Sequence, residues 1–87
     1  MEFIKKYDNN YQRNVYTLEG KCITLTISRE RVYKKDKWQS VGKWKVTYYN
    51  NPHTHELDGR MLVDSYKTLK GAKQIAIHYM ENYDYNH

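Results

Sequence analysis

Hydrophobic and polar residues alternate regularly between residues 22 and 49, and this pattern predicts two long β-strands. Every second residue from Ile23 to Ile27 is aliphatic, and the residues between them carry hydroxyl groups. The same alternation runs from Trp44 to Tyr48. A period of two residues, with many β-branched side chains, is typical of strands that bury one face. The polar segment Lys34–Lys37 is the turn that we expect between them.

The position of this turn predicts which residues face one another. A loop centred on Lys35 and Asp36 makes the numbers of opposed residues add up to 71, and it places all the alternating apolar residues on one face. A slip of one residue would move them to the other face. The predicted pairs are Ile23 with Tyr48, Leu25 with Val46, Ile27 with Trp44, Arg29 with Gly42, Arg31 with Ser40 and Tyr33 with Trp38.

The residues before this hairpin predict one further strand. Glu19-Gly20 is expected to form a two-residue turn, which sets Tyr16 opposite Ile23 on the apolar face. Residues 1–13 are polar, and a turn is expected at 8–10. The pattern leaves two alternatives open for this segment, an edge strand or a loose arm.

The residues after the hairpin predict a strand and a helix. A fourth strand is expected at Arg60–Ser65. Thr68 is a suitable N-cap for a helix from Leu69 to about Asn82. The stripe expected to face the sheet is Leu69, Ala72, Ile75, Ala76, Tyr79 and Tyr83. The sequence therefore predicts an α+β fold, a single domain over residues 1–87 with 84–87 as a tail, in which an antiparallel β-meander of about four strands carries one C-terminal α-helix on its apolar face.

The positive charge of the chain is concentrated in the predicted long hairpin. Residues 29–45 contain seven basic and two acidic residues, so this segment alone accounts for the formal net charge of +5. Cations with exposed aromatic rings suit phosphates and bases. The candidate residues for binding nucleic acid or an acidic partner are Arg29, Arg31, Tyr33, Lys34, Lys35, Lys37, Trp38, Lys43 and Lys45. The alternative is that Tyr33 and Trp38 only stiffen the hairpin while the lysines keep its turn soluble.

Other patterns argue against catalysis and against export. His53, His55, Glu56 and Asp58 crowd one polar loop, but the spacing favours a plain loop over a zinc or acid–base site. No catalytic residue, metal ligand or cofactor is therefore expected. No apolar run is long enough for a membrane span, the first residues lack a signal peptide's apolar run, and Cys22 is the one cysteine, so a cytoplasmic location is expected.

The helix entry, Lys67-Thr68-Leu69-Lys70-Gly71-Ala72-Lys73-Gln74-Ile75-Ala76, resembles two groups of proteins. One is the last helix of double-stranded-RNA-binding domains, which have a further helix before their strands where this chain predicts none. The other is a group of small phage-encoded proteins, some of them anti-CRISPR inhibitors, in which a sheet precedes a similar helix. The second resemblance implies an inhibitor acting in the host cytoplasm, and it assigns no functional residue.

These observations predict a small non-enzymatic binding protein. The expected partner is nucleic acid or a host complex that handles nucleic acid, engaged by the basic hairpin of a phage-type inhibitor. Two alternatives are a protein-interaction module or homodimer that uses exposed tyrosines, and a small ribonuclease toxin that uses His53 or His55 with Arg60.

Overall fold

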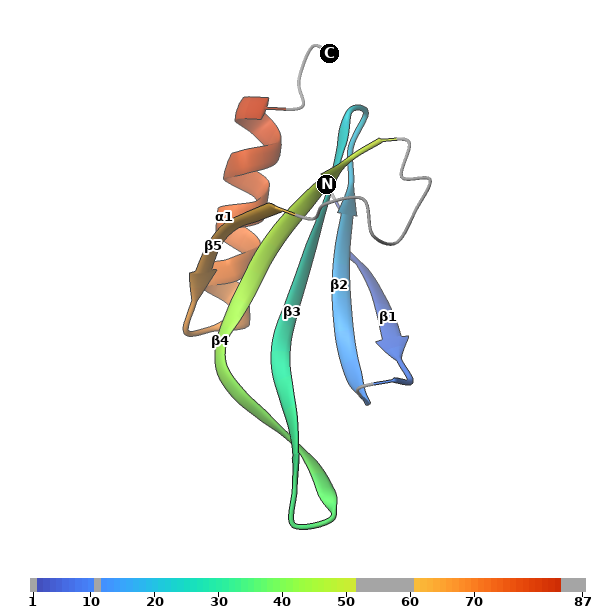
Figure 1. Ribbon diagram of the computed structural model, residues 1–87. Coiled ribbons are helices and arrows are strands. Elements are labelled where there is room, and N and C mark those ends of the chain that lie inside the picture. The colour runs from blue at the N-terminus through green and yellow to red at the C-terminus, as the bar shows by residue number, and fades with distance from the viewer. Residues whose placement is uncertain (1, 11, 52–60, 84–87) are drawn as a thin grey trace.

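The computed structural model describes residues 2–10, 12–51 and 61–83 and shows an α+β fold (Figure 1). One antiparallel sheet contains five strands in the order β1-β2-β3-β4-β5, and the helix α1 follows it. The elements are β1 (Ile4–Asp8), β2 (Arg13–Glu19), β3 (Ile23–Lys34), β4 (Lys37–Asn50), β5 (Met61–Tyr66) and α1 (Leu69–Tyr83). Strand order equals chain order, as the predicted meander requires, but there are five strands instead of about four.

The additional strand is β1, which settles the two alternatives for the N-terminal residues. β1 pairs with β2 from Ile4 opposite Thr17 to Asp8 opposite Arg13, so it is an edge strand. The Asp8 carboxylate accepts a hydrogen bond from the Asn10 backbone N–H at 3.0 Å. This local bond favours the turn, because Asp side chains commonly bond the backbone two residues on.

The predicted two-residue turn between β2 and β3 is wrong. Tyr16 lies opposite Ile27 instead of Ile23, and the Gly20 N–H donates to the Ile23 carbonyl oxygen at 2.9 Å. Asn51 explains why the connection between β2 and β3 is longer, because Asn51 forms hydrogen bonds with residues of this connection. Its backbone N–H donates to the Cys22 carbonyl oxygen at 2.8 Å, and its Nδ2 donates to the Gly20 carbonyl oxygen at 3.0 Å. This partner is about 30 residues away in sequence, so a local pattern does not reveal it.

The β3–β4 hairpin follows the predicted register near its turn and departs from it in the body of the sheet. Tyr33 opposite Trp38 and Arg31 opposite Ser40 are confirmed. A bulge then places two extra residues, Gly42 and Lys43, on β4. From there inward the pairs are Arg29 with Trp44, Ile27 with Val46, Leu25 with Tyr48 and Ile23 with Asn50, so all four predicted pairs of that region are wrong.

The predicted apolar face of the hairpin is unchanged by this correction, because the register shifts by two residues and side chains alternate between the faces with the same period. Leu25, Ile27 and Val46 are fully buried on the predicted apolar face. α1 packs on that face against β3, β4 and β5, as predicted. Trp44 lies at the margin of the core and is only half-buried.

The helix begins where its cap predicts. The Thr68 hydroxyl accepts a hydrogen bond from the Gly71 N–H at 3.1 Å. Ala72 and Ala76 are fully buried, and these small side chains allow α1 to approach the sheet closely. Met80 joins them in the core, whereas Tyr83, which the predicted stripe includes, is 56% exposed.

Candidate functional site

The outer part of the β3–β4 hairpin projects beyond the helix and the other strands (Figure 1). The pairing of β2 with β3 ends at Ile27, and that of β5 with β4 ends at Trp44. Residues 29–43 are termed the arm here, and across its outer part β3 and β4 pair only with each other among the described residues. From Glu30 to Lys35 in the turn the arm is ~17 Å long at a rise of about 3.3 Å per residue.

The arm contains most of the predicted binding residues. Its six basic residues are Arg29, Arg31, Lys34, Lys35, Lys37 and Lys43, and its two acidic residues are Glu30 and Asp36. The three lysines at the tip are all exposed. The arm therefore presents a net positive charge on a ribbon that is accessible from several sides.

Two features of the tip reduce its stability. Lys34 and Lys37 lie directly opposite each other, and like charges in such a pair are destabilising. Lys35 and Asp36 form the predicted turn with φ angles of 52° and 62°. A two-residue hairpin turn needs positive φ at both positions, where glycine and asparagine are favoured and a lysine is strained. Stability does not explain this choice of residues.

The two arginines are oriented along the arm by bonds to its opposite strand. Arg31 Nη1 donates to Ser40 Oγ at 2.7 Å. Arg29 Nε donates to the Gly42 carbonyl oxygen at 3.0 Å, and its guanidinium carbon lies 6.0 Å from the centre of the Trp44 ring. A guanidinium group has five N–H donors, so these bonds position each group without exhausting its capacity to donate.

The aromatic pair at the tip is formed as predicted. The rings of Tyr33 and Trp38 lie edge to face, with centroids 5.5 Å apart at 63°. This contact stiffens the tip. The Tyr33 side chain is nevertheless 59% exposed, whereas Trp38 is half-buried. The pair therefore satisfies the structural role and still leaves the Tyr33 ring accessible to a ligand.

The structure separates Lys45 from the arm and brings it near cations that the sequence analysis did not select. Lys45 lies opposite Ser28 and Ser65 in the body of the sheet, on the face that α1 leaves uncovered. Lys6 and Arg13, on β1 and β2, line polar hollows on that same face. The alternation of side chains along each strand shows which cations share this face, but only once β1 and its register are known.

A cluster of tyrosines lies on the helix side of the sheet, where the C-terminal end of α1 contacts β4. Tyr79 lies between Tyr48 and Tyr83, with ring centroids 5.3 Å and 4.3 Å away respectively. Burial raises the pKa of the Tyr79 hydroxyl above its ordinary value, and the hydrogen bond and charge of Tyr48 add to this effect. Beside the cluster, β5 and α1 border an open hollow of about 530 Å³.

The loop that contains His53, His55, Glu56 and Asp58 lies outside the described residues, as does Arg60. In the part of the chain that the structure describes, no group of three or more His, Cys, Asp or Glu residues could hold a metal ion. No helix within the same residues is long and apolar enough to cross a membrane. Comparison with protein-family models, curated proteins and solved structures gives no match for this chain.

Proposed function

We propose that the protein binds nucleic acid through the arm. The observation that carries this proposal is the tip, where three exposed lysines are held on a turn and a cross-strand pair that lower the stability of the hairpin. Residues in a strained or repulsive arrangement that lowers stability point to a role outside folding. An anionic ligand would neutralise the repulsion between Lys34 and Lys37, so binding would also stabilise the tip.

The dimensions and chemistry of the arm suit this ligand. A two-stranded ribbon fits the major groove of DNA, which is about 12 Å wide and 8.5 Å deep. Lysines at the tip release counterions when they contact phosphates. Arg29 and Arg31 can donate in pairs to phosphate oxygens or to guanine edges. In this role the arm would compete for the phosphate-binding path of a host complex that handles nucleic acid. We propose that the protein obstructs the host complex in this way, as a phage-type inhibitor.

Charge reversal at the tip tests the proposal. Lys34→Glu, Lys35→Glu and Lys37→Glu are combined in one variant, and Lys5→Glu, Lys67→Glu and Lys70→Glu in a control with the same change in charge at exposed positions off the arm. Binding to labelled DNA and RNA is measured by fluorescence anisotropy over a salt series. We expect the tip variant to lose affinity and to flatten the dependence on salt by about one unit of slope for each lost duplex phosphate contact. Equal affinities and slopes for the tip variant and its control would refute the proposal.

Recovery from a bacterial lysate, with and without nuclease, tests the class of partner. Nucleic acid that co-purifies with the wild type and disappears with the tip variant supports direct binding. A protein that remains after nuclease treatment and depends on the tip lysines indicates an acidic protein partner, and it contradicts direct binding to nucleic acid.

A second candidate function is self-association through β5, and the distribution of exposed apolar side chains favours it. β5 is an edge strand that pairs only with β4 among the described residues, and such edges recruit other strands. Four of the seven exposed large hydrophobic side chains of the described chain belong to β5 or the end of α1, namely Met61, Leu62, Tyr66 and Tyr83. Sedimentation velocity tests this candidate. Leu62→Lys should dissociate the dimer, and Ile4→Lys on the opposite edge strand should not.

A further inference from the structure

The sheet has one face that α1 does not cover, and the middle strands present hydroxyl groups and cations on it. Opposed residues share a face, so the row Ile4, Thr17, Thr26, Thr47 and Leu62 crosses all five strands on the side away from the helix. The next rows add Lys6 opposite Val15, and Lys45 between Ser28 and Ser65. Thr17 and Thr26 at the centre of the first row are buried, and Ile4 and Leu62 at its ends are exposed. The exposed cations Lys6 and Lys45 are therefore the charged groups that a ligand on this face can reach.

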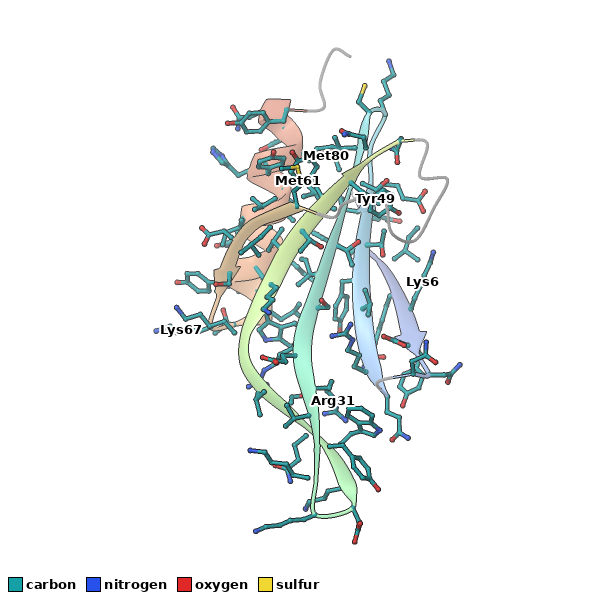
Figure 2. All side chains as sticks on the ribbon, in the orientation of Figure 1. Lys6, Arg31, Tyr49, Met61, Lys67 and Met80 are labelled. Carbon is teal, nitrogen blue, oxygen red and sulfur yellow. The ribbon has the colours of Figure 1, made fainter. Side chains whose placement is uncertain are left out.

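Two hollows on this face join into one path that leads to the arm. The first, of about 250 Å³, is lined by Lys6, Tyr7 and Arg13, among others. The second, of about 360 Å³, is lined by Arg13, Arg31 and Lys45. Arg13 and Ser28 line both hollows, so the two are direct neighbours. Figure 2 shows the labelled Tyr49, Lys6 and Arg31 distributed along the length of the sheet and the arm.

Cations outnumber acids along this path. Its four basic residues are Lys6, Arg13, Arg31 and Lys45, and its two acidic residues are Asp8 and Glu30. The Asp8 carboxylate is already paired with Arg13 Nε at 3.3 Å. Arg13 also donates from Nη1 to the Arg29 carbonyl oxygen at 2.8 Å, which fixes it where the arm leaves the sheet. The path is therefore electrostatically complementary to a chain of phosphates.

Aromatic rings on the path favour a single strand over a duplex. Tyr49 lies opposite Thr24 on this face and lines the first hollow, and the exposed Tyr7 borders the hollow from the edge strand β1. Unpaired bases can stack on such rings, whereas bases inside a duplex cannot reach them. Sheet surfaces that combine cations with stacking rings bind single strands with little sequence preference.

We propose that a single strand of nucleic acid lies across the uncovered face of the sheet and continues onto the arm. Its phosphates contact Lys6, Arg13 and Lys45 before they reach Arg31, and a base stacks on Tyr49. This inference rests on the proposed function and extends the binding site from the arm to the body of the sheet.

Neighbouring residues on opposite faces provide a matched test. Lys6→Glu with Lys45→Glu changes the path, and Lys5→Glu with Lys70→Glu makes the same change in charge elsewhere, because Lys5 faces the helix side of β1. Tyr49→Ala removes the ring, and Tyr49→Phe keeps it. Binding to a labelled single strand and to the duplex of the same sequence is measured over a salt series, and thermal unfolding confirms that each variant is folded.

The inference predicts that Lys6→Glu with Lys45→Glu weakens single-strand binding about ten-fold or more and lowers the salt slope by roughly 0.7 for each lost contact. Tyr49→Ala should weaken it roughly 5- to 150-fold, the range for loss of one stacked base, and Tyr49→Phe should bind as the wild type does. Wild-type affinity in the Lys6 and Lys45 variant, together with a loss in the tip variant, would overturn this inference and leave the proposed function standing. A wild-type protein that binds neither single strand nor duplex would overturn both.

Discussion

Gly42 is the residue through which the arm joins the sheet, and its replacement gives a sharp test of the bulge. Its φ angle is +75°, and a Cβ built there meets no atom within 4 Å. The cost of Gly42→Ala should therefore come from the backbone alone. A left-handed conformation costs an alanine about 1–2 kcal/mol, and the lower entropy of the unfolded chain returns about 0.4–1 kcal/mol. We expect a net loss of ~1 kcal/mol.

Three variants separate this backbone effect from other causes. Gly42→Asn should lose less than Gly42→Ala, because asparagine tolerates positive φ. Lys43→Ala is the control next to it, an exposed residue whose φ is not positive, and it should stay within about 0.5 kcal/mol of the wild type. Urea unfolding measures the global stability, and amide hydrogen exchange of residues 30–41 detects opening of the arm alone.

Two results would contradict this reasoning about Gly42. Unchanged stability and unchanged exchange in Gly42→Ala would mean that the backbone there is not left-handed, and the bulge would lose its basis. A loss above about 3 kcal/mol would mean that the added methyl group meets a neighbour, which contradicts the open space around Gly42.

Two further predictions concern the helix and the tyrosine cluster. A Cβ at Gly71 would overlap the Tyr66 ring, so Gly71→Ala should destabilise the wild type by about 1–2 kcal/mol. In a Tyr66→Ala protein the same change should stabilise by about 0.5–1 kcal/mol, because alanine has the higher helix propensity. Urea unfolding measures both effects, and the same sign in both backgrounds would refute the contact. Above pH 10.0 the unfolded chain ionises Tyr79 while the folded protein keeps it neutral, because its folded pKa is raised. The unfolded state then binds fewer protons, so the free energy of unfolding should fall as pH rises through this range. Unfolding curves at alkaline pH should show a smaller fall for Tyr79→Phe than for the wild type. Tyr33→Phe is the control and should not lessen the fall.

The fold was predictable wherever neighbouring residues decide it. The turn at Lys35-Asp36 and the pairs beside it depend on a two-residue loop, and they are confirmed. The cap at Thr68 is equally local and equally correct. The register beyond Gly42 failed because the apolar residues stay on one face after a shift of two, so the pattern could not distinguish the two registers. A glycine inside a strand often marks a bulge, and Gly42 was the signal that could have revealed it.

The candidate site was harder to predict, because residues distant in sequence form its second half. The density of charge along residues 29–45 indicated the arm, since a hairpin keeps near neighbours together. That density says nothing about which face each cation occupies. Lys45 belongs to this run but lies on β4 in the body of the sheet. The pairing of β4 with β3, of β3 with β2 and of β2 with β1 places it on the same face as Arg13 and Lys6.

The arm and the uncovered face meet at Arg13, and this joint makes one continuous surface from two sets of residues. Arg13 is held from two sides, by Asp8 of the edge strand and by the Arg29 carbonyl oxygen at the base of the arm. Loss of its side chain would leave both hollows without their shared cation. A ligand that uses only the tip would not depend on Arg13, whereas a ligand that follows the whole path would. The residue that distinguishes the two modes of binding therefore lies between them, on β2, outside the segment that the charge pattern selects.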